Sequence, residues 1–412
     1  MSQSATHQRL PAYALFAGLL AAAGLPVYIH APKYYVDEYG VSLAALGAVL
    51  FALRLVDVVQ DPLFGRISET LRGHRAATVV VGAGVMAISM VGLFAVDPPI
   101  APVWWFAITL TGVFSGFSFL TISFYAQGVI KAAGLPGQGH LRLARWRETG
   151  ALIGVCAAAI APVALGGILD RPFAGFAAGF AVLALFSVTA MRPEWSTKGV
   201  AEGVGLREIL RDRLARRLLL LALVNAAPVA VSSTLFLFFV DNRLQAPEAQ
   251  GPLLLLFFLA AAAAAPIWGF LAERYGPKPV LLGAMVLAIL AFGYAAFLGP
   301  GDWPQFAVIC LLSGFAMGAD LTLLPAIFAT RMAKVSPSAA EGFGLWAFVS
   351  KFTLAFAAVT LLPMLEWAGF DAAAPENPAN ALMLLSIFYA AVPCALKLIA
   401  IALLASTDLK ET

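Results

Sequence analysis

The sequence predicts an all-α transmembrane protein of twelve helices, arranged as two pseudo-symmetric halves of six helices each. Three observations predict this class. Of the 412 residues, 61% are hydrophobic and only 12% are charged, whereas soluble domains carry about 25% charged residues. Apolar runs long enough to cross a bilayer, about 20 residues each, recur along the chain. The longest basic stretch, from Arg192 to Arg217, falls in the middle of the chain.

The apolar runs divide the chain into twelve expected spans, with polar or turn residues between them. These are residues 11–30, 42–64, 76–96, 102–130, 147–169, 173–191, 217–240, 251–272, 279–298, 304–330, 341–367 and 380–406. The three cysteines, Cys156, Cys310 and Cys394, lie within these runs and have no metal-type spacing. We interpret them as packing residues.

Basic residues gather in alternate loops, which fixes the expected orientation. One set of loops contains Arg66, Arg72, Arg75, Lys131, Arg142, Arg145, Arg207, Arg211, Arg274, Lys278, Arg331 and Lys334. The other set has only Lys33, Arg171 and Arg243, next to acids such as Asp37, Glu38, Asp97 and Asp170. By the positive-inside rule the first set is cytoplasmic. We therefore expect a bacterial-type inner membrane protein with both termini in the cytoplasm.

The central basic stretch predicts a linker between two halves. We expect an N-terminal six-helix bundle over 1–191, a cytoplasmic linker over 192–216 and a C-terminal six-helix bundle over 217–412. A weak repeat supports this division: Asp61-Pro-Leu-Phe-Gly-Arg-Ile-Ser-Glu69 is echoed by Ala265-Pro-Ile-Trp-Gly-Phe-Leu-Ala-Glu273. Chance turn chemistry is the simpler explanation of the repeat. Two repeated halves of six helices resemble the layout of the major facilitator superfamily.

Span 42–64 holds an unusual set of polar residues. Asp57 and Asp61 are four residues apart and share a helix face, with Gln60 beside them and Arg54 one turn earlier. A charge at the bilayer centre costs about 2.5–3.5 kcal/mol, so such residues normally face a cavity or a partner. Two carboxylates and an amide oxygen are hard ligands suited to a small cation such as Na⁺. The pair could instead hold a proton, or form a structural ion pair with Arg54.

Later spans offer polar residues that could face these acids. Ser118 and Thr121 lie three apart in span 102–130, although hydroxyls in helices often bond only to their own backbone. Arg147 stands at the start of the next span. In the C-terminal half, Asp320 and Lys351 are expected near mid-depth, where they could pair with each other. Such a pair could take part in transport, or it could be a salt bridge with a structural role only.

Other polar residues of the C-terminal half are open to two interpretations. Asn225, with Ser232, Ser233 and Thr234, could line the same cavity or serve as helix-contact polar residues. We expect Lys397 to lie near the inner end of its span, with its ammonium group reaching the interface.

Four segments carry a resemblance to a narrower family. Arg54-Leu-Val-Asp-Val-Val-Gln-Asp-Pro-Leu-Phe-Gly65 resembles the signature R-x-x-D-x-x-x-D-P-x-x-G of the glycoside–pentoside–hexuronide:cation symporters, the family that contains the melibiose permease. Arg142-Leu-Ala-Arg-Trp-Arg147, Gly318-Ala-Asp-Leu-Thr-Leu-Leu-Pro325 and Glu341-Gly-Phe-Gly-Leu-Trp-Ala-Phe-Val-Ser-Lys351 resemble further segments of the family in the expected order. The first string is fairly specific, and the matches spread over the whole chain.

The resemblance implies residue roles. The coupling cation would be bound by Asp57, Gln60, Asp61 and Ser118. For the solute site the resemblance implies Arg147, Lys351 and Tyr125, with Tyr125 at the place of an aromatic residue that stacks on the sugar. We also expect Thr121, Asn225, Asp320 and Trp346 at this site. The resemblance implies no cofactor beyond the coupling ion. Gln60 stands where the permease has a shorter Asn, so H⁺ and Na⁺ both stay open, and we favour H⁺.

The chain also departs from the family. Span 11–30 has no carboxylate where the permease binds sugar hydroxyls, and Thr121 replaces a second sugar-binding acid. Thr330 and Ala333 replace an acidic motif. With two acids lost and Arg147 and Lys351 kept, we hypothesise an anionic, zwitterionic or amphiphilic solute rather than a neutral disaccharide.

The expected function is a cation-coupled secondary transporter (symporter) that moves a small organic solute by alternating access. A drug or metabolite exporter is the alternative within transport, and a membrane-embedded enzyme, a lipid scramblase or a receptor is the alternative outside it. The four histidines are scattered and no HExxH, GxSxG or P-loop string occurs, so we expect no enzyme. The expected partners are the solute and the bilayer. A monomer suffices for the mechanism, and the net charge of +3 does not indicate nucleic acid.

Overall fold

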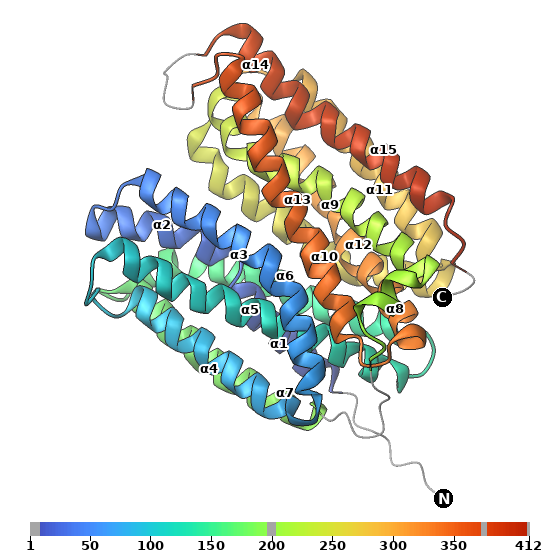
Figure 1. Ribbon diagram of the computed structural model, residues 1–412. Coiled ribbons are helices and arrows are strands. Elements are labelled where there is room, and N and C mark those ends of the chain that lie inside the picture. The colour runs from blue at the N-terminus through green and yellow to red at the C-terminus, as the bar shows by residue number, and fades with distance from the viewer. Residues whose placement is uncertain (1–8, 196–202, 372–376, 410–412) are drawn as a thin grey trace, which may run out of the picture.

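The computed structural model describes residues 9–195, 203–371 and 377–409, and every regular element in these ranges is a helix (Figure 1). The N-terminal helices are α1 (Leu10–Ala22), α2 (Leu25–Tyr39), α3 (Leu43–Thr70), α4 (Arg75–Phe94), α5 (Pro102–Ala133), α6 (Gly139–Gly166) and α7 (Pro172–Met191). A short α8 (Leu206–Arg211) follows. The C-terminal helices are α9 (Arg213–Phe238), α10 (Gln250–Tyr275), α11 (Pro277–Gly293), α12 (Trp303–Val335), α13 (Ala340–Trp367), α14 (Ala379–Ser386) and α15 (Val392–Ala405).

The expected spans are present, with one correction at the start of the chain. Within the described residues, ten helical segments are long and apolar enough to cross a membrane. The two other expected spans correspond to α3, which is 28 residues long, and to the α1–α2 pair. The expected span 11–30 is wrong in its bounds. Helix α1 stops at Ala22, and α2 continues to Tyr39 through residues expected to form a loop.

Local sequence explains where these helices begin and end. Leu25 and a proline open α2 after Gly24, and a proline at a helix start lacks the N–H that would continue the preceding helix. Gly40 ends α2 in the left-handed conformation, with φ of 65°, which suits glycine. Ser42 then caps α3 by accepting a hydrogen bond from the backbone N–H of Ala45 at 3.3 Å.

The repeat found in the sequence corresponds to two equivalent helix contacts between the halves. Gly65 on α3 faces α13, and a Cβ on it would lie 3.0 Å from the carbonyl oxygen of Ala340. Gly269, at the matching position on α10, faces α6. A Cβ on it would lie 2.9–3.1 Å from side-chain carbons of Arg145. The small residue at each place lets a helix of one half approach a helix of the other. The repeat thus has a packing role that chance turn chemistry does not explain.

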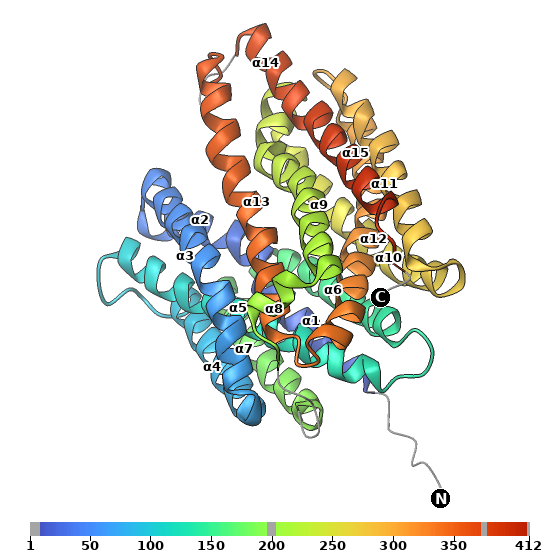
Figure 2. The ribbon, with the colours of Figure 1, turned by 45° about the vertical axis from the view of Figure 1, so that its right-hand side comes forward.

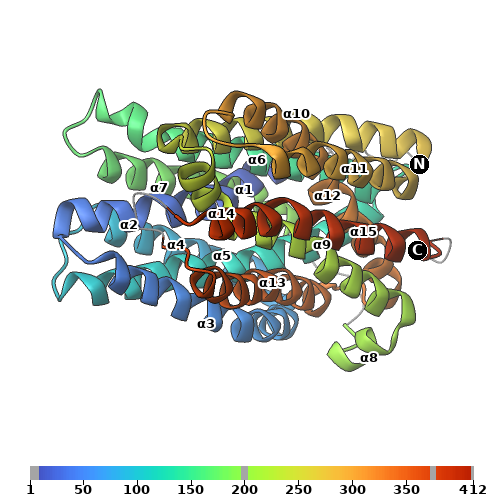
Figure 3. The same cartoon turned by 90° about the horizontal axis from the view of Figure 1, so that it is seen from above.

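The two groups of helices meet at one end and diverge toward the other. Figure 2 shows the ribbons converging near α8 and separating toward α2 and α14, and Figure 3 shows the same helices from above. At the converging end Arg145 pairs with Glu273 at 3.6 Å. There the linker residue Gly203 also donates its N–H to Glu69 at 2.8 Å. This end carries the basic loops.

Candidate functional site

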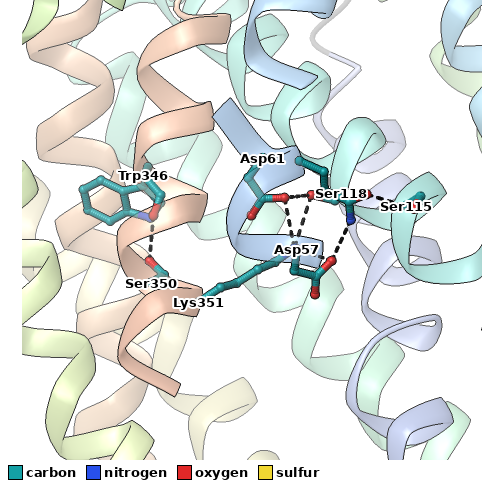
Figure 4. A network of polar contacts seen from close by, with 8 residues as sticks. Asp57, Asp61, Ser115, Ser118, Trp346, Ser350 and Lys351 are labelled. Carbon is teal, nitrogen blue, oxygen red and sulfur yellow. Dashed lines mark hydrogen bonds and ion pairs between the residues drawn. The ribbon is translucent and has the colours of Figure 1, made fainter. Parts of the chain in front are cut away.

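The centre of the candidate site is an ion-pair network that joins α3, α5 and α13 (Figure 4). Asp57 and Asp61 lie on the same face of α3, as their spacing predicts. The ammonium group of Lys351, from α13, lies 3.4 Å from Oδ1 of Asp57 and 3.1 Å from Oδ1 of Asp61. A lysine of the C-terminal half therefore reaches between two carboxylates of the N-terminal half.

Ser118 and Gln60 complete this network. The Ser118 hydroxyl donates to Oδ1 of Asp61 and accepts from Lys351 at 3.2 Å. Ser118 therefore bonds to the acids rather than back to its own helix. Gln60 donates through Nε2 to Asp57 at 2.7 Å, and its Oε1 accepts from the hydroxyl of Ser115 at 3.0 Å. Sequence reasoning missed Ser115, although it lies one turn before Ser118 on the same helix face.

The network is buried, and one carboxylate oxygen in it has no partner among the described residues. Asp57 is 3% exposed and Asp61 is fully buried, while the Lys351 side chain is 14% exposed. Oδ2 of Asp61 makes no hydrogen bond to any described residue. A buried carboxylate oxygen without a partner is costly, so Asp61 favours the binding of a cation. The side chain of Arg54, the other ion-pair partner considered for these acids, lies outside the described residues.

A second cluster lies two turns further along α5. The ring of Tyr125 stacks under the guanidinium of Arg147, whose Cζ is 3.7 Å from the ring centroid. Glu148 Oε1 accepts from both, from Arg147 Nε at 2.6 Å and from the Tyr125 hydroxyl at 3.1 Å. Nη2 of Arg147 is buried and has no hydrogen-bond partner among the described residues. Sequence reasoning missed Glu148, because an acid next to an arginine on a helix gives no distinct signal.

Two other expected solute residues, Thr121 and Trp346, make no side-chain hydrogen bond to either cluster among the described residues. The hydroxyl of Thr121 is buried and forms no hydrogen bond within the described part of the chain. Trp346 packs on Phe328 of α12, with ring centroids 4.9 Å apart. The nearby ring of Phe343 lies 5.1 Å from that of Tyr125, so aromatic residues of both halves close over the Arg147 cluster.

The expected pairing of Asp320 with Lys351 is wrong in this conformation. Asp320 instead forms an ion pair with Lys397 of α15, and Lys397 also donates to Oδ1 of Asn225 at 2.7 Å. Lys397 is only 5% exposed, so the expectation that it reaches the interface is wrong as well. The hydroxyls of Ser232, Ser233 and Thr234 bond to carbonyls of their own helix. Asp320 and Asn225 thus belong to a separate site inside the C-terminal bundle.

Comparison with known proteins agrees with this architecture. A family model described as MFS/sugar transport protein matches residues 12–411. The chain belongs to this family. As a major facilitator transporter, it is a multi-pass membrane protein rather than an enzyme, and its substrate class is a small-molecule solute. No curated protein matches the chain.

Two solved structures share the major facilitator fold. The human organic anion transporter MFSD10 (TETRAN) is 18% identical with a TM-score of 0.67, and the match covers 96% of this chain and 98% of that one. A bacterial homologue of the iron transporter ferroportin, in an outward-facing state, is 15% identical with a TM-score of 0.70 and the same coverage. At these identities the likeness concerns the fold alone.

Proposed function

We propose that this protein is a cation-coupled symporter, and that Asp57 and Asp61 bind one monovalent cation per transport cycle. The carrying observation is the buried carboxylate of Asp61, which lies beside Asp57 and Lys351 and keeps Oδ2 without a hydrogen-bond partner among the described residues. One H⁺ or one Na⁺ bound at this oxygen would satisfy it. Carboxylate and hydroxyl oxygens of Asp57, Asp61 and Ser118 are suitable ligands for Na⁺. The amide oxygen of Gln60 accepts from Ser115 here and would have to turn toward the carboxylates to bind it. Close carboxylates also favour a shared proton, and we favour H⁺.

Lys351 supplies a link between cation binding and movement of the two halves. Its ammonium belongs to the C-terminal half, yet it contacts both carboxylates of the N-terminal half. An incoming cation competes with it, because both are attracted to the same oxygens. Binding at this point therefore changes the contact between the halves, which is the contact that alternating access must rearrange. We propose that the units that move are the halves 1–191 and 217–412; residues 196–202 of the expected linker between them lie outside the described residues.

The second cluster supports a zwitterionic solute. Arg147 and Glu148 form a buried ion pair, with side chains 6% and 7% exposed. Because the two charges balance, the cluster is close to neutral. We therefore favour the zwitterionic class among the anionic, zwitterionic and amphiphilic solutes expected from the sequence. The unpartnered Nη2 of Arg147 can donate to a carboxylate of the solute, and Glu148 can accept from an amine. Tyr125, Thr121 and Trp346 would line the path to this cluster.

We propose uptake rather than export, and the support for this is the orientation that the basic loops predict. In that orientation the converging end faces the cytoplasm, and the helices diverge toward the outside of a bacterial-type inner membrane. This conformation suits the capture of an external solute and cation. An exporter of the same fold would move its solute against the direction of the ion gradient, whereas a symporter moves it along that gradient. The direction of solute flux under an imposed ion gradient therefore distinguishes the two.

A current measurement on proteoliposomes tests the proposal. The purified protein is placed on a solid-supported membrane and challenged with amino acids, betaines, organic acids, sugars and lysolipids, at several pH values with and without Na⁺. A solute-dependent current that is lost in both Asp57→Asn and Asp61→Asn supports the symporter. Asp97→Asn, which changes an exposed loop carboxylate, is the control and should keep the current. Solute binding with no current, unchanged in both variants, would overturn the proposal.

A further inference from the structure

The C-terminal bundle contains a cavity that the transport proposal does not use. It measures about 80 Å³ and lies among α9, α10, α11, α12 and α15. Its walls are mainly apolar, with Phe257, Ile289, Phe292 and Met317 among them, and Asp320 and Lys397 form its polar end. Since a water molecule needs about 10–15 Å³ by this kind of measure, the cavity has room for several molecules of that size.

The polar end has one spare acceptor and one spare donor. Asp320 is 8% exposed, and its Oδ1 is buried without a hydrogen-bond partner among the described residues. The Lys397 ammonium has three N–H donors, of which two are used, by Asp320 Oδ2 and Asn225 Oδ1. A single hydroxyl group can satisfy both, by donating to Asp320 and accepting from Lys397.

Charge decides which chemical class fits. The carboxylate of Asp320 and the ammonium of Lys397 already balance each other, so a charged ligand would leave one charge in excess in an apolar bundle. Ser232 and Ser313 also line the cavity. Their hydroxyls are uncharged and donate to carbonyls of their own helices, so the charge balance is unchanged. The walls are suited to an aromatic or aliphatic body.

We propose that this cavity is a second ligand site, which binds a small uncharged molecule with an apolar body and one hydroxyl group. The site is distinct from the Asp57–Asp61 cation centre and shares no residue with it. It does not depend on the transport proposal, because binding here needs neither the cation nor movement of the halves.

A cysteine in the cavity wall provides a direct readout. Cys394 lines the cavity and is partly exposed, whereas Cys156 and Cys310 are buried. In a Cys156→Ala/Cys310→Ala protein in nanodiscs, the rate of alkylation of Cys394 by N-ethylmaleimide is followed by intact-mass spectrometry. The probes are benzyl alcohol and ethylbenzene, which have the same size and differ in the hydroxyl. A Cys310→Ala/Cys394→Ala protein, which keeps only Cys156 in the other half, controls for general effects of the probes on the bilayer.

The decisive comparison uses Asp320→Leu/Lys397→Met. This double variant removes both charges together and keeps an apolar end, a replacement that buried ion pairs often tolerate. Benzyl alcohol should slow alkylation in the parent protein and should need an about tenfold higher concentration in the double variant, as expected for the loss of a hydrogen bond to a charged group. Ethylbenzene should act at similar concentrations in both. Asp57→Asn should leave the protection of Cys394 unchanged, even where it abolishes transport.

Three results would overturn the proposal. Equal protection by benzyl alcohol in the parent and the double variant would mean that the hydroxyl does not meet Asp320. Absence of protection by both probes would mean that the cavity holds water only. A Cys394 that does not react over hours would mean that the cavity does not admit small molecules.

Discussion

Lys351 of α13 donates a hydrogen bond to Asp61 of α3 at 3.1 Å, and this contact joins the two halves of the transporter at a fully buried carboxylate. Asp61 also accepts from Ser118, so its Oδ1 is shared by two donors. The contact makes the C-terminal half a ligand of the candidate cation site in the N-terminal half.

Replacing Lys351 with Met should raise the affinity for the coupling cation at least tenfold while reducing solute uptake. The ammonium competes with the cation for the same carboxylate oxygens, and attraction between charges 3–4 Å apart is worth about 4 kcal/mol near a protein surface. Cation-dependent thermal stabilisation of the purified protein measures the affinity. Lys33→Met, which removes an exposed lysine paired with Asp37, is the matched control. Weaker cation binding in Lys351→Met would contradict competition.

Removing the hydroxyl of Ser118 should affect the two candidate cations in opposite directions. It should weaken Na⁺ binding about tenfold, because an oxygen ligand is lost, and it should strengthen H⁺ binding, because the Asp61 carboxylate loses a donor that stabilises its charged form. The loss of a hydrogen bond to a charged group costs about 1.5–3 kcal/mol, and part of that cost returns through rearrangement. Ser115→Ala is the comparison, because Ser115 contacts Gln60 and not the carboxylates. Its effect on the cation dependence of transport currents should be smaller. Equal effects of the two serines would place the cation nearer Gln60 than Asp61.

Glu148→Gln should raise the KM for the solute about tenfold and leave the cation dependence within about twofold. The substitution keeps the shape of the side chain but removes the charge that positions Arg147 and accepts from Tyr125, at a cost of about one charged hydrogen bond. Initial uptake rates at varied solute and cation concentrations separate the two effects. Glu366→Gln, at an exposed carboxylate on α13, is the control. A shifted cation dependence with an unchanged KM would move Glu148 into the cation site.

Gly65→Val should prevent the halves from closing at the end that carries the basic loops. The added side chain meets backbone atoms of Ala340 and Gly344 at 3.0–3.2 Å, and backbone cannot move aside as a flexible side chain can. A cysteine introduced at Ser350 should then react severalfold faster with an impermeant maleimide added from that side. Gly84→Val, on α4, has open space around its Cβ and should leave the rate unchanged. Equal rates in Gly65→Val and the parent would show that the contact does not control access.

The stability contribution of Asp212 should depend on pH. Asp212 caps α9 and pairs with Arg331 at 2.6 Å, and the hydrogen bonds from Arg331 lower the pKa of its carboxyl below the ordinary value of 3.8. A lowered pKa stabilises the folded state above the unfolded pKa, and this contribution is lost as pH falls through the folded value. Asp212→Asn should therefore lower the Tm at pH 6, and this difference should shrink as the pH falls below the ordinary value of 3.8. A Tm difference that is constant from pH 3 to pH 6 would contradict the ion pair.

Much of the fold could be predicted from the sequence, because a helix that crosses a membrane needs a long apolar run. The short helices at the start could not be placed, since the break at Gly24 interrupts the run and α2 contains polar residues such as Lys33 and Asp37. The spacing of Asp57 and Asp61 was sufficient to place both on one helix face, and Ser118 lies against them as the resemblance implied.

Pairings between distant helices were harder to predict. We expected Asp320 and Lys351 at mid-depth and Lys397 near the inner end of its span, and the sequence contains no information on which helix is the neighbour of α12. The structure pairs it with Lys397. Lys351 is instead drawn to the site with two carboxylates. The narrower resemblance to the glycoside–pentoside–hexuronide:cation symporters stays a prediction, and so do the residue roles taken from it.

The ratio of charge to solute moved is the most direct test of the central claim that Asp57, Asp61 and Lys351 take up one coupling cation. It is obtained from the reversal potential of solute flux in proteoliposomes with known solute and ion gradients. We predict one positive charge per net-neutral solute in the parent protein and none in Asp61→Asn. A ratio of zero in the parent, or the same ratio in Asp61→Asn, would contradict the account.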